Sequence, residues 1–280
     1  MTAHGLPGPE VLEAFEIVGP LETLRENDSG SVVRSGDTVL KWIGPYSMEH
    51  QDSLSVAPLA IETIDGVDEE EKQFRLAKPK KTIDGRWLTE NGWSAWSYVE
   101  GRPAGVADTA AVIGAANRFH VAIRHVPKHD ALDKNTSPWG LAHRYCLESL
   151  PRNIHPDISP LVAALSELVS PIEDAADQLI HGDLNPGNVL VADGMPPALI
   201  DFTPWWGPPE FAVAMFANFL GPRQGSAYCL EAFADISHFP QYLIRAAIRM
   251  LFIVAIPDGA HDWEEERTAA EIVLDWVGKS

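Results

Sequence analysis

Basic residues are scarce in this chain. Its 280 residues include 21 lysines and arginines against 40 aspartates and glutamates, which gives a formal net charge of −19. A protein that binds nucleic acid needs a basic face to neutralise phosphates, so the charge argues against nucleic acid as a partner. The acidic surplus either keeps the surface soluble or attracts a cationic small molecule, and the composition leaves both interpretations open.

The chain also has few cysteines and no long apolar run. Cys146 and Cys229 are the only cysteines and have no metal-ligand spacing, so we expect two free thiols in a reducing compartment. The apolar run at residues 250–256 is far shorter than the ~20 residues of a spanning helix. Residues 1–8 contain no basic segment followed by an apolar core. We therefore expect a cytoplasmic protein without a membrane partner.

What is present is an ordinary globular composition, with 45% apolar residues. The first hundred residues favour strands. β-Branched runs around a glycine-containing turn predict a hairpin over residues 32–42, and residues 74–83 and 93–99 supply further strands. Residues 47–64 have helical character, and Pro58 must begin, end or kink a helix there.

The second part of the chain favours helices. Asp108 is placed to cap a helix that runs to about Arg124. Apolar residues at helical spacing predict further helices at residues 158–168, 243–254 and 269–276. The polar break at residues 99–103 separates the two patterns. We therefore expect an α+β bilobal fold, with a small β-rich lobe over residues 1–98 and a larger helical lobe over residues 99–280.

One stretch interrupts the helical pattern and carries the side chains best suited to chemistry. Residues 181–188 read His-Gly-Asp-Leu-Asn-Pro-Gly-Asn, and a predicted hairpin over residues 189–200 leads to Asp201. Because that hairpin folds the chain back, we expect Asp201 to lie close to Asp183 and Asn188. Phosphoryl transfer needs hard oxygen ligands for Mg²⁺ and a carboxylate beside the acceptor hydroxyl. These three side chains supply both.

The order of these residues resembles the signature of a known family. His-Gly-Asp, four residues, Asn and a strand pair ending in Ile-Asp-Phe is similar to aminoglycoside phosphotransferases and choline-kinase-like enzymes. The resemblance implies a protein-kinase-like fold, ATP and Mg²⁺ as cofactors, and the hydroxyl of a small molecule as acceptor. It implies that Asp183 is the catalytic base and that Asn188 and Asp201 bind the metal. Gly182 is typical of the small-molecule branch, since protein kinases usually carry arginine there.

The resemblance extends to a lysine in the first lobe. Lys41 ends a predicted strand, where such folds keep the lysine that contacts the ATP phosphates; the alternative is an exposed strand lysine. Its acidic partner is open between Glu49 and Glu62. His120 matches a histidine that commonly ends a helix in the family, and we expect it to be buried and structural.

Two further segments are candidates for contacts with the nucleotide. Small residues around Ser29 and Ser31 either offer backbone N–H groups to phosphate oxygens or form an ordinary loop. The segment that contains Ser97 and Val99 resembles the hinge of the family. The resemblance implies that the backbone of these two residues bonds the adenine edge.

The chain also departs from the family pattern. Thr203 stands where a glycine usually follows the metal-binding Asp-Phe pair, and Ala212 replaces an aspartate that usually braces the catalytic loop. These losses motivate an alternative, a nucleotide-binding module of the same fold without turnover. Trp205 and Trp206 follow closely, and they either stack against a flat substrate or pack in the core.

An acidic cluster near the C-terminus bears on the acceptor. Asp262, Glu264, Glu265 and Glu266 lie beside Trp263, and the resemblance places late helices along the acceptor side of the cleft. Such a cluster attracts amines, and we expect a cationic or polyhydroxylated acceptor. The candidates are an aminoglycoside or other antibiotic, an amino alcohol or a sugar. The same residues also suit the positive end of a helix dipole, which explains them equally well.

Overall fold

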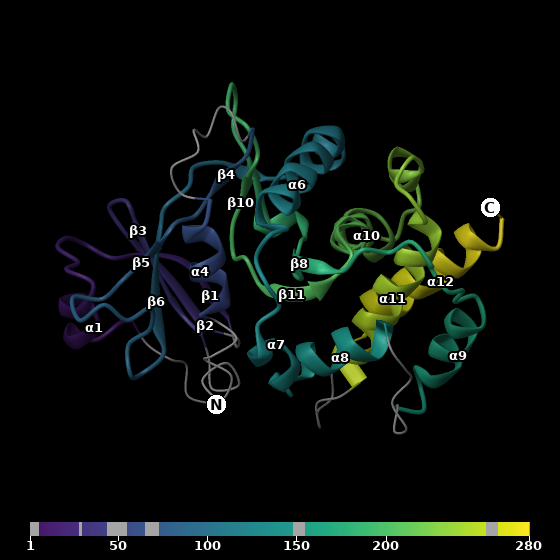
Figure 1. Ribbon diagram of the computed structural model, residues 1–280, viewed down its shortest axis with the longest axis horizontal. Helices are drawn as coiled ribbons and strands as arrows, with labels where there is room; N and C mark the ends of the chain where they lie inside the picture. Colours follow the sequence, from purple (N-terminus) through teal and green to yellow (C-terminus); the bar gives the residue numbers. More distant parts are fainter. Residues whose placement is uncertain are drawn as a thin grey trace.

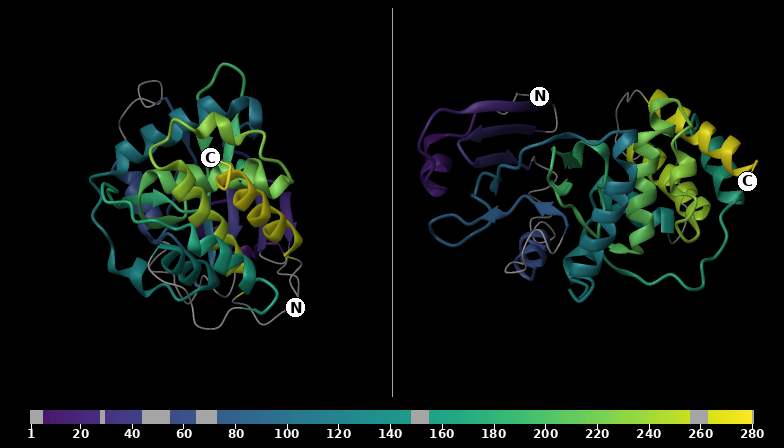
Figure 2. Two further views of the ribbon diagram at one scale, coloured as in Figure 1. Left: turned by 90° about the vertical axis from the view of Figure 1, so that its right-hand side faces the viewer. Right: turned by 90° about the horizontal axis from the view of Figure 1, so that it is seen from above.

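The structure is a computed structural model that describes residues 6–27, 30–43, 55–64, 73–147, 155–255 and 263–279. A β-rich N-terminal part and a helical C-terminal part lie next to each other along the longest axis of the molecule (Figure 1). Seen from above, the first strands and the last helices again lie at opposite ends (Figure 2). The described residues therefore form the two-part α+β architecture that the sequence predicts.

An antiparallel five-stranded sheet forms the N-terminal part, in the order β1-β2-β3-β6-β5. Its strands are β1 (Glu22–Asn27), β2 (Gly30–Ser35), β3 (Thr38–Trp42), β5 (Pro79–Lys80) and β6 (Trp93–Ser97). β2 and β3 pair around Gly36, whose φ of 58° suits glycine, so the predicted hairpin is confirmed. The short helix α1 (Pro9–Ala14) adds Val11 to a small core with Val33 and Leu40 of the sheet.

A second, smaller sheet joins segments from both parts of the chain, in the order β4-β10-β9-β7. Its strands are β4 (Arg75–Leu76), β7 (Arg102–Pro103), β9 (Val189–Val191) and β10 (Ala198–Leu199). β4 pairs in parallel with β10, so a strand of the first hundred residues borders the predicted catalytic hairpin. Helix α4 (Val56–Glu62) packs into the larger core through Ile61, with Pro58 in its first turn. The lobe boundary between residues 98 and 99 stays a prediction.

The C-terminal part is built from helices around one large core. The α-helices are α6 (Thr109–Ile123), α7 (Asp130–Lys134), α8 (Pro138–Leu147), α9 (Ser159–Glu167), α10 (Pro209–Leu220), α11 (Phe239–Ala255) and α12 (Glu264–Val277). Short 3₁₀ helices are η1 (Val106–Asp108), η2 (Pro186–Asn188), η3 (Pro222–Gln224) and η4 (Leu230–Phe233). α6, α9, α11 and α12 coincide with the helices predicted from apolar periodicity, whereas α7, α8 and α10 were not predicted.

The predicted cap of α6 is wrong in its mechanism. The Asp108 side chain does not bond the first N–H groups of the helix. Its carboxylate instead accepts a hydrogen bond from the Gly105 N–H at 2.8 Å and pairs with Arg102 at 2.8 Å. The Asp108 carboxylate therefore stabilises the turn that precedes α6 and does not cap the N–H groups of its first turn.

Both cysteines lie in this helical part. Cys146 and Cys229 are buried and form no disulfide, which confirms the expectation of free thiols. In the portion of the chain that the structure describes, no helix is long and apolar enough to cross a membrane.

Candidate active site

The predicted catalytic loop lies between two strand pairs. β8 (Gln178–His181) leads into the loop and pairs antiparallel with β11 (Pro204–Gly207). After the loop, β9 and β10 form the predicted hairpin, and the Ile200 N–H donates to the Asn188 carbonyl at 2.9 Å. This bond holds the two ends of the hairpin together, so Asn188 and Asp201 are neighbours in space.

Asn188 fixes the position of Asp183. Its Nδ2 donates to Asp183 Oδ2 at 3.0 Å and to the Asp183 carbonyl at 2.8 Å. Asn185 Nδ2 donates to the same carbonyl at 3.2 Å. Because the amide nitrogen of Asn188 is engaged, its Oδ1 is the atom left to act as a ligand for a hard cation.

Asp201 connects this loop to the N-terminal sheet. Lys41, at the end of β3, forms an ion pair and a hydrogen bond with Asp201 Oδ1. Asp201 also has a φ of 53°, in the left-handed region that a non-glycine residue seldom adopts. Such strain costs of order 1–3 kcal/mol and is typical of functional sites. The structure therefore brings together Lys41, Asp183, Asn188 and Asp201, as the sequence predicts.

Two buried histidines brace the loop. The backbone N–H of His181 donates to His120 Nε2 at 3.2 Å. His181 Nε2 donates to the Ile200 carbonyl at 3.1 Å, and the Asp183 N–H donates to His181 Nδ1 at 3.3 Å. Burial lowers the pKa of both imidazoles, that of His120 to about 3. Neutral imidazoles thus hold the loop, for which the resemblance implies an aspartate at position 212. The buried, structural role predicted for His120 is confirmed.

Gly182 is required by its neighbour Trp205. A Cβ atom on Gly182 would collide with the indole ring of Trp205. That ring is 3% exposed and stacks on His143 with 4.9 Å between ring centroids, so it has little room to move. Of the two roles that the sequence left open for Trp205, the structure shows packing, because its ring lies against Gly182 and His143.

The two aspartates of the site differ in their electrostatic environment. Burial raises the pKa of Asp183, while the positive charge of Arg249 acts in the opposite direction. Burial also acts to raise the pKa of Asp201, but the charge and hydrogen bond of Lys41 outweigh it, and the pKa is lowered. Asp201 is therefore held as a carboxylate, whereas Asp183 is the more basic of the two.

The sequence analysis missed Arg249 as part of the site. It lies on α11, is 1% exposed, and among the described residues forms no ion pair with a carboxylate. The hydrogen bond found for its guanidinium runs from Nη1 to Met215 Sδ at 3.8 Å. An arginine inside an apolar, fully buried stretch of helix is the sequence signal that could have identified it.

Two candidates for the acidic partner of Lys41 were open. Glu62 pairs with Lys81 at 3.0 Å, so in this structure it is not that partner. Glu49 lies outside the described residues. Asp201 takes the place of a partner for Lys41.

The predicted contacts with the nucleotide base and phosphates stay predictions. Ser29 lies outside the described residues, and Ser31 is buried in β2. The Ser97 N–H donates to the Lys78 carbonyl at 2.7 Å, and Ser97 Oγ accepts from the Lys78 N–H at 2.8 Å. The N–H of Ser97 is thus engaged within the sheet and not available to adenine. Val99 follows where the chain leaves β6.

Comparisons with known proteins agree with this geometry. The model of a phosphotransferase enzyme family matches residues 55–248, a range that contains the loop and both metal-ligand candidates but not Lys41. No curated protein matches the chain.

Solved structures similar to this chain include several small-molecule kinases. One is a thermostable mutant of aminoglycoside phosphotransferase APH(4)-Ia with AMP-PNP and hygromycin B (TM-score 0.62, 17% identity, 96% of this chain and 97% of that one). Another is choline kinase LicA from Streptococcus pneumoniae (TM-score 0.61, 13% identity, 97% of each chain). A third is amicoumacin kinase hAmiN with AMP-PNP and Ca²⁺ (TM-score 0.58, 13% identity, 97% and 92%). At these identities the likeness concerns the fold, and it confirms the bilobal protein-kinase-like fold.

Proposed function

We propose that this chain, which belongs to the phosphotransferase enzyme family, transfers the γ-phosphate of ATP to a hydroxyl group of a small molecule. The observation that carries the proposal is the ion pair between Lys41 and Asp201 beside the hydrogen-bonded pair of Asp183 and Asn188. Phosphoryl transfer needs a cation on the phosphates, oxygen ligands for a metal and a base for the acceptor. These four side chains match that set.

The residues present suit Mg²⁺. Asn188 Oδ1 and the Asp201 carboxylate are hard oxygen donors, and the lowered pKa of Asp201 keeps its carboxylate charged. When bound, Mg²⁺ neutralises charge on the phosphates of ATP. Lys41 carries a second positive charge for the same phosphates.

Asp183 then has the role of the base. The acceptor oxygen forms a bond to the γ-phosphorus, the bond from that phosphorus to the ADP oxygen breaks, and the hydroxyl proton passes to Asp183. Burial raises the pKa of Asp183 and makes it a better proton acceptor. The hydrogen bonds from Asn188 keep the carboxylate oriented while it acts.

The alternative of a nucleotide-binding module without turnover rests on Thr203 and Ala212. The absence of an aspartate at position 212 is weak support for this alternative, because hydrogen bonds to His120 and His181 hold the loop. A module that only bound nucleotide would need no base hydrogen-bonded to a metal ligand.

The acidic cluster gives no support to a cationic acceptor. Glu265 and Glu266 both pair with Arg223, at 2.8 and 2.9 Å, and Glu266 is 4% exposed, so one of the two negative charges is balanced within the protein. Asp262 lies outside the described residues. The free thiols and the use of ATP fit a cytoplasmic location.

Consumption of ATP in the presence of a panel of hydroxylated small molecules tests the proposal. We expect at least one acceptor to stimulate turnover in the wild type and not in Asp183→Asn. Millimolar Mg-ATP should also raise the melting temperature, because a ligand at a hundredfold excess over its Kd stabilises the folded state by ~2.7 kcal/mol. An unchanged melt would refute binding of ATP, and a shifted melt without turnover on any acceptor would favour the non-catalytic alternative.

A further inference from the structure

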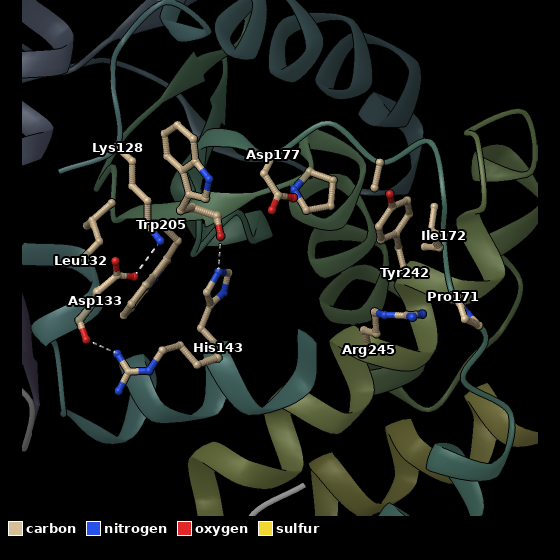
Figure 3. A pocket seen from close by; sticks show the side chains of 14 residues that line it. Lys128, Leu132, Asp133, His143, Pro171, Ile172, Asp177, Trp205, Tyr242 and Arg245 are labelled. Carbon is tan, nitrogen blue, oxygen red and sulfur yellow. Dashed lines mark hydrogen bonds and ion pairs between the residues drawn. The ribbon is translucent and has the colours of Figure 1, made fainter. Parts of the chain in front are cut away.

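A cavity of about 360 Å³ lies in the helical part, next to β11. Its walls come from α7, α8, the segment before β8, β11 and α11 (Figure 3). Trp205, Trp206 and Tyr242 give it aromatic surfaces. A small molecule with a flat body fits walls of this kind.

The cavity is adjacent to the catalytic loop. Trp205 lines the cavity, and its ring, including Nε1, occupies the place that a side chain on Gly182 would take. Gly182 directly precedes Asp183. One side chain therefore forms both the wall of the cavity and the packing surface of the loop that carries the base.

Among the residues that line the cavity, cationic side chains outnumber carboxylates by one. Lys128 and Asp133 pair at 2.7 Å and neutralise each other. Arg144 and Arg245 remain, and neither forms an ion pair with a carboxylate in the ranges that the structure describes. Of the described residues that line the cavity, Asp177 is the remaining carboxylate. Burial, together with the nearby carboxylates of Glu210 and Asp174, raises the pKa of the Tyr242 hydroxyl. In a chain with a net charge of −19, a local surplus of cations is the reverse of the general surface.

The two arginines are held by carbonyl groups. Arg144 Nη1 donates to the carbonyls of residues 133 and 135, both at 2.9 Å. Arg245 donates through Nη2 to the Ser170 carbonyl at 2.8 Å and through Nη1 to Gln241. These bonds fix the guanidinium groups without neutralising them, and burial lowers the pKa of Arg245. Arg245 is 8% exposed, and since a buried charge without a counter-ion is costly, an anion in the cavity would compensate for its charge.

Two buried polar atoms on the lining residues have no hydrogen-bond partner among the residues that the structure describes. They are Trp205 Nε1 and His143 Nδ1. His143 Nε2 donates to the Trp206 carbonyl at 3.1 Å, and burial lowers the pKa of this imidazole to about 3. His143 is therefore neutral, and its Nδ1 is a hydrogen-bond acceptor. The residues that line the cavity thus supply aromatic rings and two guanidinium groups, while Trp205 Nε1 packs against Gly182.

We infer that this cavity binds the phosphoryl acceptor and that the acceptor is a flat alcohol that carries a carboxylate. The inference rests on the proposed function and replaces the cationic acceptor expected from the sequence. A carboxylate matches the planar fork of an arginine with two parallel hydrogen bonds. The ring of such an acceptor would lie against the aromatic walls, next to the loop of Asp183.

Three alcohols that differ in one group test the inference. They are 4-(hydroxymethyl)benzoate, 4-(hydroxymethyl)benzamide and 4-(hydroxymethyl)benzylamine. Calorimetric titration into the full chain with Mg-AMP-PNP gives each Kd, and ATP consumption gives each rate. We expect the benzoate to bind at least about tenfold more tightly than the other two, since a hydrogen bond between charged groups has about that effect or more.

Variants assign the effect to the cavity. Arg144→Gln should reduce the preference for the benzoate about tenfold. Arg124→Gln is the matched control, because Arg124 is exposed at the end of α6 and does not line the cavity. Arg245→Gln is a second test provided that its melt is unchanged, since Arg245 is 8% exposed and joins α11 to residue 170.

The outcomes separate this inference from the proposed function. Benzoate binding no tighter than that of the amide, including no binding of any alcohol, overturns the anion site, as does an equal loss in Arg124→Gln. Turnover of the benzylamine in preference to the benzoate overturns it too, while the phosphotransferase proposal stands. Binding of the benzoate that depends on Arg144, without ATP consumption on any of the three alcohols, overturns the assignment of the cavity to the phosphoryl acceptor, and the wider panel of hydroxylated small molecules then decides the phosphotransferase proposal by itself.

Discussion

Replacing Gly182 by alanine should destabilise the protein through Trp205 alone. The φ of Gly182 is not in the left-handed region, so the backbone itself accepts alanine. The new methyl group would overlap the indole ring, which the stack on His143 and its burial hold in place. Overpacking of a filled core costs about 1–3 kcal/mol. We expect a loss of that size in the free energy of unfolding.

A double-mutant cycle identifies the cause. Trp205→Leu alone should cost about 3 kcal/mol, because a large buried ring is lost. In the Gly182→Ala, Trp205→Leu double variant the methyl group no longer meets a ring, so the two effects should fall short of their sum by about 1–3 kcal/mol. Gly105→Ala is the control, since its Cβ would make an ordinary contact at 3.8 Å and its cost should stay within about 0.5 kcal/mol.

Urea denaturation followed by far-ultraviolet circular dichroism measures the free energy of unfolding of the wild type and the four variants. Additive effects of the two substitutions would refute the steric account, and so would a loss in Gly105→Ala equal to that in Gly182→Ala. The single variant Gly182→Ala should also lose turnover, because the displaced ring shifts the residue next to Asp183. Turnover that survives a loss of stability would show that the loop and the ring adjust independently.

Three further predictions follow from the site and the core. Asp183→Asn should abolish transfer and leave binding of Mg-ATP nearly intact, whereas Asp201→Ala should weaken that binding; equal Kd values by titration would contradict these roles. Burial lowers the pKa of His120 and His143 to about 3 from 6.5, so the unfolded chain binds more protons between these values. Stability should therefore fall below pH 6.5 by up to about 1.4 kcal/mol per pH unit for each histidine, and His143→Gln should flatten this slope in urea titrations at pH 7.5 and 5.5. Alkylation without reductant should label both cysteines after unfolding, and mass spectrometry that finds a disulfide would contradict the free thiols.

The part of the site that could be predicted from residue spacing is local in the chain. A short hairpin joins Asn188 to Asp201, so its folding brings them together whatever the rest of the protein does. Lys41 is 160 residues from Asp201, and only the resemblance to a family connected the two. The roles of Ser97 and Glu62 depended on which neighbour their side chains and backbone meet, and a sequence does not fix such neighbours.

Other contributions come from packing between distant elements. Arg249 lies on α11, and its charge acts on Asp183 across the core. The pairing of Glu266 with Arg223 turned a predicted surface cluster into a buried ion pair. In both cases the charged residue type suggested a solvent-exposed side chain, but tertiary contacts between helices bury it.

The replacement of the bracing aspartate by Ala212 is consistent with an active enzyme. Ala212 is fully buried on α10 and offers no side-chain acceptor to the loop. The neutral imidazoles of His120 and His181 hold the same loop without adding negative charge. Burial raises the pKa of Asp183, and the positive charge of Arg249 opposes that rise. The loop that carries Asp183 is thus held by hydrogen bonds to His120 and His181, and the loss of the family's aspartate at position 212 is compatible with a working base.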